Sequence, residues 1–292
     1  MALTHAVIIP TYGRREVLGR LLVWLGEQTK LPDEVIISTT DDMQVPVVKT
    51  RFPVSKVFGI KCISAQRNRG LEMALGRFDV ITYLDDDLIP ATRYLERACR
   101  ALEQNPDWAV VMGHIIRDGA TTGEISWADG LAALRAADVI DETGDNATDQ
   151  IGAQGGNMTI RTAMIGDLRF DERLALYSWQ EDIDFTTQLG RRGRIVCLPA
   201  IRSVHMAVRG GRMSGLRFGY SQVVNPVYLL RKGTMPASFA LKLMARNIAA
   251  NMVRSVRPEI HIDRRGRLRG NLMALGHLLK GRVEPEYILQ IQ

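Results

Sequence analysis

The feature that most restricts the fold of this chain is an alternation of short apolar runs with longer amphipathic stretches through its first half. Four runs, at residues 5–10, 33–39, 57–60 and 80–84, have the length and composition of buried strands. The stretch at residues 14–28 places leucines and a valine on one helical face. This order predicts βαβ units, a mainly parallel sheet and therefore an α/β protein.

Polar side chains follow several of these runs. Thr11 follows the first, Asp41 follows the second, and three consecutive aspartates from Asp85 to Asp87 follow the fourth. Three adjacent carboxylates repel one another, so solvent, basic neighbours or a bound cation must offset their charge. Because ligands of open α/β sheets bind outside the carboxyl ends of strands, we predict a site for Mg²⁺ or Mn²⁺ and substrate phosphates at this edge. A solvated acidic turn is the alternative.

Two further segments carry candidates for the same cleft. Arg67 lies in a predicted helix over residues 64–75, and its guanidinium donates two hydrogen bonds at once to a phosphate. A surface arginine without a ligand is the alternative interpretation. Gly155 and Gly156 precede a β-like run, where the missing side chains allow the backbone to approach another group closely.

Acidic residues also open a predicted helix near residue 181. Glu181, Asp182 and Asp184 complement the helix dipole at that position, which is a purely structural role. A carboxylate held there in a cleft is also a candidate general base, because an attacking hydroxyl must lose its proton. His205, at the end of a predicted pair of strands over residues 194–205, is either a satisfied histidine or a metal ligand.

The chain between Arg117 and Gln150 is polar and irregular, which predicts a mobile loop beside the cleft. The three cysteines are widely spaced, which predicts neither a disulfide framework nor a metal site and favours a reducing compartment. We find neither a secretory signal pattern nor an apolar run long enough to span a bilayer. These observations predict a cytoplasmic protein, free or bound peripherally to the inner face of the cell membrane.

Charge is distributed unevenly along the chain, whose net charge is +6. Residues 191–282 hold 19 Lys or Arg against two acids, whereas residues 1–190 hold 19 against 28. The basic region has amphipathic helices that either pack as a C-terminal subdomain or lie on an anionic membrane surface. Few aromatic residues are interleaved with its basic residues, which argues against a nucleic-acid partner. One predicted apolar side comprises Leu241, Leu243, Met244, Ile248, Met252 and Val253.

Several motifs in a fixed order resemble glycosyltransferase family 2. The resemblance covers about residues 5–235 and implies the GT-A fold, which has a Rossmann-like, mixed and mostly parallel sheet with flanking helices. It implies a catalytic domain at residues 1–210 and a basic helical extension at residues 211–292. The motifs are IIPTYGR (8–14), AQRNRGLEMALGRFDVITYLDDD (65–87), GGNMTIR (155–161), EDIDFTTQLGRRGRI (181–195), His205 and NPVYLLRKG (225–233).

The resemblance implies an inverting enzyme that moves a sugar from a nucleotide-diphosphate donor, a UDP-sugar, to an acceptor hydroxyl on a saccharide or lipid-linked intermediate. It implies that Asp182 is the catalytic base and that Asp85, Asp87 and His205 hold Mg²⁺ or Mn²⁺. The residues that it places against nucleotide, sugar or acceptor are Thr11, Asp41, Arg67, Asp85, Asp86, Gly156, Asn157 and Glu181.

The sequence departs from the family pattern at one place, and two other classes of function are also compatible with it. Family members commonly read VVDDGS after the second strand, whereas this chain reads IISTTDDM, so the contact to the base comes from Asp41 or Asp42 or is lost. A metal-dependent nucleotidyltransferase or phosphatase also uses aspartates at a strand end. A non-catalytic glycan-binding module with the same fold is the third alternative.

Overall fold

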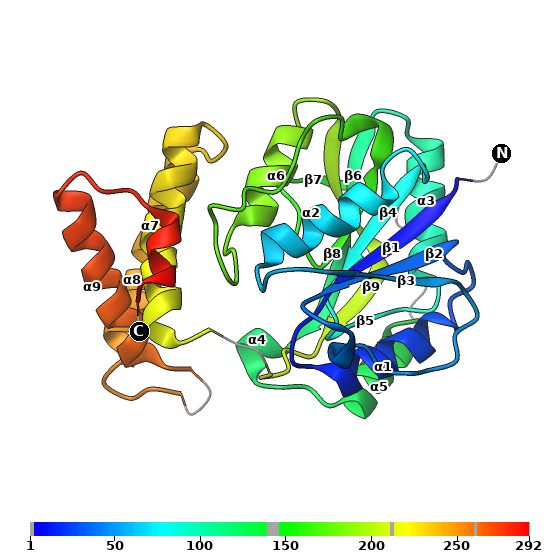
Figure 1. Cartoon of the computed structure of the whole chain (residues 1–292), viewed down its shortest axis with the longest axis horizontal. Helices are drawn as coiled ribbons and strands as arrows, with labels where there is room; N and C mark the ends of the chain where they lie inside the picture. Colours follow the sequence, from blue (N-terminus) through cyan, green and yellow to red (C-terminus); the bar gives the residue numbers. More distant parts are fainter. Residues whose placement is uncertain (1–2, 139–145, 211–212, 260–261, 292) are drawn as a thin grey trace.

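A β-sheet with helices on both faces organises the first two thirds of the computed structural model (Figure 1), which describes residues 3–138, 146–210, 213–259 and 262–291. The four predicted N-terminal strands are parallel neighbours in the order β3-β2-β1-β4. They are β1 (His5–Pro10), β2 (Glu34–Thr39), β3 (Val54–Phe58) and β4 (Val80–Leu84). The predicted bounds of β1 and β4 are confirmed, whereas β3 begins and ends earlier than expected because it pairs with β2 through residues that are only partly apolar.

The second half of the sheet mixes strand directions. β8 runs antiparallel to β4 and β6, and β9 runs parallel to β6, so the order continues β4-β8-β6-β9-β5. The two short strands β5 and β7 both pair antiparallel with β9. The bounds are β5 (Leu88–Pro90), β6 (Trp108–Asp118), β7 (Thr148–Asp149), β8 (Asn157–Arg161) and β9 (Arg194–His205). The predicted α/β class with a mixed sheet and flanking helices is confirmed.

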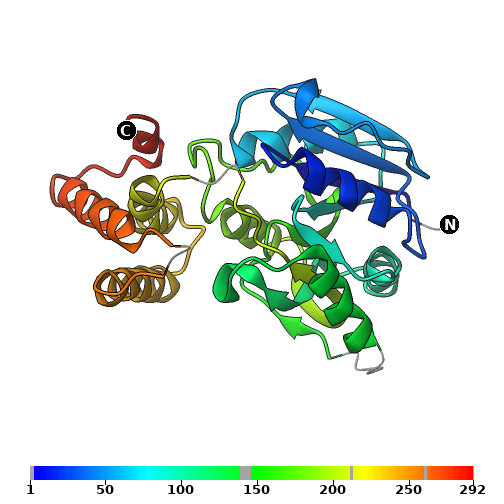
Figure 2. The same ribbon diagram turned by 90° about the horizontal axis from the view of Figure 1, so that it is seen from below.

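Side chains of the central strands alternate between two apolar layers. Val7 and Ile9 of β1 pack toward α1 (Arg15–Leu25) and α3 (Tyr94–Gln104). Ala6 and Ile8 pack toward α2 (Ile63–Ala74) and α6 (Glu181–Leu189), on the opposite face. Because successive strand residues point to opposite faces and both faces are covered, these strands are apolar throughout. Figures 1 and 2 show the helices on the two faces.

Two predictions about connecting segments are wrong. The expected loop from Arg117 to Gln150 contains α4 (Gly119–Thr122), α5 (Trp127–Asp138) and β7, while residues 139–145 lie outside the described residues. α5 forms because its apolar residues, including Leu134, pack against Ile89 and Val204, which only the folded chain brings near. The expected pair of strands is the single strand β9, which stays continuous because irregularities in its pairing with β6 absorb Pro199 without a turn.

Three long helices form a group beside the sheet (Figure 2), which confirms the predicted helical extension. α7 and the residues that follow it pack against the segment that precedes α6, where Leu229 and Met235 share an apolar cluster with Leu174. The predicted single apolar side of α8 is wrong: Leu243, Met244 and Ile248 face its neighbours, whereas Leu241, Met252 and Val253 are exposed. The bounds are α7 (Gly215–Lys232), α8 (Ala237–Arg254) and α9 (Arg264–Leu279), with short 3-10 helices η1 (Asp42–Gln44), η2 (Thr162–Met164) and η3 (Pro285–Leu289).

Candidate functional site

The three consecutive aspartates form a turn at the carboxyl end of β4, and they differ in exposure. The side chain of Asp85 is 39% exposed, whereas those of Asp86 and Asp87 are 4% and 3% exposed. The backbone nitrogen of Asp85 donates to the carbonyl oxygen of Gly156 at 3.1 Å, which ties this turn to the start of β8. Asp85 is therefore open to a ligand, while its two neighbours need partners from the protein.

Arg14 is the main partner of Asp86 and Asp87. Its Nη1 lies 2.7 Å from Asp86 Oδ1 and 3.0 Å from Asp87 Oδ2, and the Thr11 hydroxyl donates to Asp86 Oδ2 at 2.6 Å. Burial alone would lower the pKa of Arg14, but the two carboxylates outweigh it and raise that pKa. Sequence reasoning missed Arg14, although its position directly after β1 in the IIPTYGR motif is the signal that points to it.

Asp87 and His205 lie close enough to share one cation. Asp87 Oδ1 is 3.6 Å from His205 Nε2, while Asp87 Oδ2 accepts from the Val208 backbone nitrogen at 2.9 Å. Asp118 Oδ1, 2.7 Å from His205 Nδ1, orients the imidazole ring. Burial lowers the pKa of His205, but the bond to Asp118 and the charges of Asp87 and Asp85 together raise it.

This pair fits a cation that also binds substrate. No group of three or more His, Cys, Asp or Glu side chains within the described residues is arranged to hold a metal ion. Mg²⁺ and Mn²⁺ sites at diphosphates commonly use only one or two protein side chains, because phosphate oxygens and water complete the coordination. Asp87 and His205, with the open Asp85 in the same cluster, fit that kind of site.

Arg67 connects the aspartate turn to the start of α6. This buried side chain of α2 forms a close ion pair with Glu181, and its Nη2 lies 3.3 Å from Asp85 Oδ1. The backbone passes directly over both groups: a Cβ atom added to Gly155 would lie 2.2 Å from Arg67 Nη1, and one added to Gly156 would lie 2.1 Å from Asp85 Cγ. The geometry agrees with the close backbone approach expected from this glycine pair.

Glu181 and Asp182 begin α6 with different partners. Glu181 pairs with Arg67, whereas Asp182 Oδ2 accepts from the Gly155 nitrogen at 3.0 Å and its Oδ1 from the Ile183 nitrogen at 2.8 Å. Burial raises the pKa of Glu181 to about 8, against the opposing charge of Arg67. Burial also raises the pKa of Asp182, although Arg67 and the two backbone donors oppose it. A carboxylate with a raised pKa is the stronger base.

The segment that precedes α6 has a strained backbone and carries Tyr177, whose ring packs edge-on against Phe218. Leu176, Ser178 and Gln180 all have left-handed φ values, of 59°, 52° and 76°. Such non-glycine conformations cost energy and concentrate at functional sites. Removal of its hydroxyl from water and the charges of Asp85 and Glu181 raise the pKa of Tyr177, whose side chain as a whole is 52% exposed. Sequence reasoning missed Tyr177, although the letters YSW directly before QED are a signal.

The side chains of two predicted site residues, Asp41 and Asn157, already have hydrogen-bond partners within the protein. Asp41 caps η1 by accepting from the Met43 nitrogen at 3.0 Å, and it also accepts from Thr40 Oγ1 at 2.8 Å. Asn157 is buried, donates to the Gly113 carbonyl at 2.7 Å and accepts from the Tyr94 hydroxyl at 2.8 Å. The structure therefore brings together the other predicted residues: Thr11, Arg67, Asp85, Asp86, Asp87, Gly156, Glu181, Asp182 and His205.

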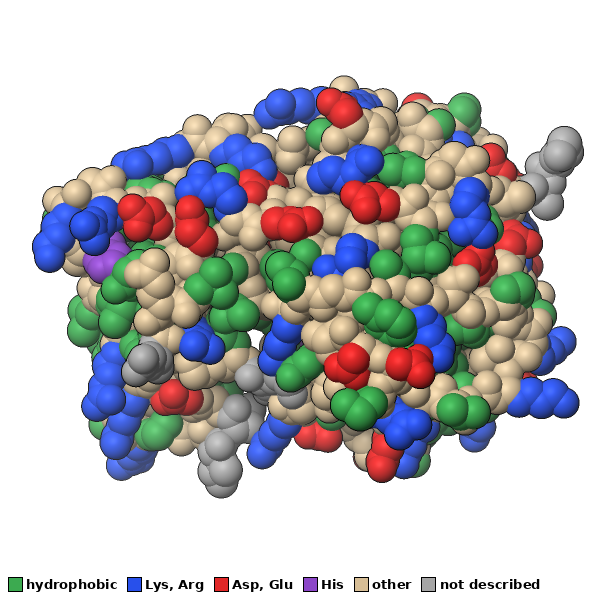
Figure 3. All heavy atoms as spheres, viewed as in Figure 1, with side chains coloured by type: hydrophobic (Ala, Val, Ile, Leu, Met, Phe, Trp, Pro, Cys, Tyr) green, Lys and Arg blue, Asp and Glu red, His purple; other side chains and the backbone are tan. Residues whose placement is uncertain are grey.

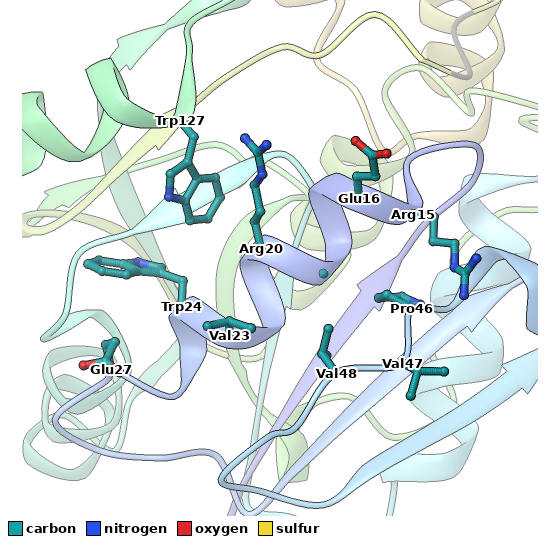
Figure 4. Close-up of a pocket in the computed structure, with 11 residues that line it drawn as sticks. Arg15, Glu16, Arg20, Val23, Trp24, Glu27, Pro46, Val47, Val48 and Trp127 are labelled. Carbon is teal, nitrogen blue, oxygen red and sulfur yellow. The ribbon is translucent and has the colours of Figure 1, made fainter.

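A separate groove of about 830 Å³ lies on the outer side of α1. Trp24 and Trp127 lie on one flank of the helix, and the segment Pro46, Val47 and Val48 lies on the other (Figure 4). None of the residues that line this groove belongs to the acidic cluster or to its partners. The groove is thus distinct from the candidate active site.

Several solved structures share the fold of this chain. TarS of S. aureus (residues 1–349) matches with a TM-score of 0.56 and 16% identity, over 97% of this chain and 82% of that chain. A second TarS structure, in complex with UDP-GlcNAc, has the same TM-score and coverage at 15% identity. The mannosyltransferase PcManGT from Pyrobaculum calidifontis, in complex with GDP-Man and Mn²⁺, matches with a TM-score of 0.52 and 15% identity, over 99% and 86% of the two chains.

At these identities the likeness shows the fold, which is the GT-A fold expected from the sequence. No curated protein sequence matches the chain. The family model described as glycosyl transferase family 2 matches residues 6–161, which is more than half of the chain and includes β1, the aspartate turn and β8. The chain therefore belongs to glycosyl transferase family 2.

Proposed function

We propose that this glycosyltransferase moves a sugar from a nucleotide-diphosphate donor to an acceptor hydroxyl with inversion at the anomeric carbon. The observation that carries the proposal is the position of Asp182, which two backbone N–H groups hold at the same sheet edge as Asp85 and Asp87. One carboxylate thus lies free to accept a proton, while the others lie where a diphosphate and its cation bind.

Asp182 acts as the general base in this mechanism. The acceptor oxygen attacks the anomeric carbon and its proton passes to Asp182, while the bond between that carbon and the diphosphate oxygen breaks and its electron pair leaves with the nucleotide. Each carboxylate oxygen of Asp182 accepts one backbone hydrogen bond, which leaves lone pairs for the acceptor hydroxyl. A base of this kind contributes about 100- to 10,000-fold to the rate.

Asp87 and His205 would hold Mg²⁺ or Mn²⁺, with Asp85 beside them. Such a cation, when bound, stabilises the negative charge that develops on the leaving diphosphate. Arg14 keeps Asp87 in place by pairing with its other oxygen, and Asp118 keeps the ring of His205 in place. The Mn²⁺ in the PcManGT complex supports the same use of metal here.

The remaining site residues would bind the donor. Asp85, whose side chain is 39% exposed, would contact the donor beside Gly156, and Thr11 would hold Asp86 in place through their hydrogen bond. Arg67 and Glu181, as an ion pair, would orient the sugar and diphosphate. Asn157, whose side chain is buried, would support the site indirectly by holding the start of β8 in place. Asp41 or its neighbour would contact the base of a UDP-sugar.

The acceptor that we favour is a saccharide or lipid-linked intermediate of polysaccharide or surface-glycan assembly. In this proposal residues 1–210 form the catalytic domain, and residues 211–292 form a basic helical region that faces an anionic membrane. The enzyme would then work in the cytoplasm, at the inner face of the cell membrane. The excess of Lys and Arg after residue 190 supports this arrangement.

A thermal-shift screen of UDP-, GDP- and dTDP-sugars, each with and without Mn²⁺, tests the proposal. A donor should stabilise the protein only with metal, because a ligand selective for the folded state raises stability by mass action. The Asp182→Asn variant should keep this shift and lose transfer, whereas Glu16→Gln, on the exposed side of α1, should keep both. Release of sugar or sugar phosphate without an acceptor would favour a phosphatase or nucleotidyltransferase, and binding unaffected by chelator would favour a glycan-binding module.

A further inference from the structure

Exposed apolar side chains gather on the C-terminal helices. Of the sixteen large hydrophobic side chains that are exposed among the described residues, eight lie between Leu241 and Leu289. That segment is less than a fifth of the chain, so the exposed apolar surface is concentrated there. Single exposed apolar residues are ordinary on a protein surface, but a group of them marks a contact surface.

On α9 these side chains form one stripe along the helix. Leu272, Leu275 and Leu279 recur at intervals of three and four residues, which places them on one side, and the partly buried Leu268 extends that side by one turn. Leu272 is 61% exposed and Leu279 is 91% exposed. Figure 3 shows hydrophobic side chains between Lys and Arg side chains on this part of the molecule.

α8 carries a second stripe. Leu241, Ala245 and Met252 lie on one side of the helix and are exposed, and the exposed Val253, in its last turn, and Val256, just after the helix, continue the apolar surface. α8 contacts both α7 and α9, and Figure 2 shows α9 on the side of α7 away from the sheet, with α8 beside them. The outer sides of α8 and α9 together are named here the α8–α9 face.

A buried polar network determines which sides of these helices point outward. Asn251 Nδ2 donates to Gln222 Oε1 and to Asn271 Oδ1, both at 2.8 Å, and Asn271 Nδ2 donates to the Gly219 carbonyl at 2.7 Å. Rotation of α8 or α9 to bury its leucines would break these bonds and leave buried amides unpaired. The exposed stripes are therefore a stable feature of the fold.

The charge around the stripes is strongly positive. Residues 211–292 contain 14 Lys or Arg and 4 Asp or Glu, which gives a local balance of +10. Lys242 and Arg246 lie beside the stripe of α8, and Arg269 and Lys280 lie beside that of α9; all four are exposed. In the part of the chain that the structure describes, none of these four pairs with a carboxylate. Their charge is thus available to an anionic partner.

We propose that the α8–α9 face docks on the surface of an anionic lipid bilayer, with its leucines in the acyl boundary and its basic side chains among the headgroup phosphates. Apolar stripes flanked by Lys and Arg are the pattern of helices that lie in the membrane interface. None of the helices within the described residues is long and apolar enough to cross a membrane, so this contact is interfacial. A second copy fits the face less well, because two surfaces of the same strong charge repel.

This inference deepens the membrane partner named in the proposed function, but it does not depend on sugar transfer. Its test is sedimentation of the full chain with vesicles of phosphatidylcholine alone and of phosphatidylcholine with phosphatidylglycerol in roughly equal amounts. The protein should bind the anionic vesicles, and the binding should weaken steeply with salt. Replacing Arg269 and Lys280 by Gln together should weaken it about 30-fold. The pair Arg20→Gln and Lys49→Gln, exposed on the catalytic half, should have no effect.

A second variant tests the apolar part of the contact. Leu272→Ser with Leu279→Ser should reduce vesicle binding by about tenfold or more, since each leucine leaves the acyl boundary. Both side chains are exposed, so the thermal unfolding midpoint should not fall. The matched pair Val23→Ser and Val47→Ser, also exposed, should bind as the unaltered chain does.

Three results would overturn the inference: no binding to anionic vesicles at low salt, an equal loss in the Val23 and Val47 control, or a dimer in solution that the leucine variant separates. The last result would assign the face to a second copy. Asp182→Asn should bind vesicles normally. If the unaltered chain binds vesicles but transfers no sugar, only the catalytic proposal is contradicted. If it transfers sugar to a soluble acceptor but does not bind vesicles, only the proposed role of the α8–α9 face is contradicted.

Discussion

Arg14 Nη1 lies 3.0 Å from Asp87 Oδ2, so a cation of the protein itself neutralises part of the aspartate turn. The same nitrogen lies 2.7 Å from Asp86 Oδ1, and Arg14 Nε donates to the Gly210 carbonyl at 2.9 Å. The guanidinium thus connects β1, the turn after β4 and the segment after β9. This connection explains how consecutive, nearly buried carboxylates persist in the folded state.

Removal of the Arg14 guanidinium should leave the carboxylates of Asp86 and Asp87 to repel each other. We expect Arg14→Gln to lower the free energy of unfolding by roughly 3 kcal/mol, because two buried carboxylates lose their counter-ion. Added Mn²⁺ should restore more stability to this variant than to the unaltered chain. Urea unfolding with metal and with chelator measures both effects, and Arg15→Gln, exposed on α1, is the control. Equal stability of the two variants would contradict this account of the turn.

Replacement of Asp182 by Asn should raise the stability of the protein and lower its activity. Its pKa is raised in the folded state, so the folded protein binds a proton more tightly there than the unfolded chain does. Above that raised pKa the charged, buried carboxylate destabilises the fold, and Asp182→Asn should therefore raise the unfolding midpoint at neutral pH. The gain should vanish as the pH falls to the ordinary range of an aspartate. Transfer should fall by about 100- to 10,000-fold. Lower stability at neutral pH would contradict this assignment.

The pH dependence of transfer should report the same carboxylate. Because Asp182 must be ionised to accept a proton and burial raises its pKa, the acid limb of kcat should lie above the range of an exposed aspartate. The limb should have the slope of one proton and should disappear from the residual activity of Asp182→Asn. Far-ultraviolet circular dichroism at each pH checks that the fold is intact. An acid limb at the ordinary value would place the base elsewhere.

Gly156 should not tolerate a side chain. A Cβ atom there would lie 2.1 Å from Asp85 Cγ, so Gly156→Ala must displace the most exposed carboxylate of the turn. We expect donor turnover to fall by about 100-fold, the order of loss that a misplacement near 1 Å causes. Gly276→Ala, where an added Cβ meets nothing within 4 Å, is the matched control. Steady-state kinetics would reveal the difference, and unchanged kinetics in Gly156→Ala would exclude Asp85 from donor binding.

Lys232 connects the C-terminal helices to the helix of the candidate base. Its Nζ lies 2.7 Å from Asp184 Oδ2 and 2.7 Å from Asp171 Oδ2. Lys232→Met should lower the free energy of unfolding by roughly 3 kcal/mol, since the Asp184 side chain is fully buried and would lose its counter-ion. Adding Asp184→Asn should recover much of that loss in a double-mutant cycle. Arg231→Met, on the adjacent exposed residue, should be neutral.

Local pattern was sufficient for the central strands and for the order of the motifs. The bounds of β1 and β4 could be predicted because strands covered on both faces are apolar throughout and are bounded by polar residues. The positions of Asp85, Asp87 and Asp182 followed from strand and helix ends, since parallel strands end at one edge of a sheet. These features depend on neighbours in the chain, which a sequence records directly.

Contacts between residues that are far apart in the sequence could not be predicted from the local pattern. Arg14 reaches Asp87, and Lys232 reaches Asp184, only after distant segments pack together. The helix α5 forms in a polar stretch because the sheet offers it an apolar surface. The sequence by itself determined the central strands, the acidic turn and the family. Only the tertiary structure decided which cation meets each buried carboxylate and which side of α8 and α9 remains exposed, because burial and desolvation belong to the packed chain and not to its local pattern.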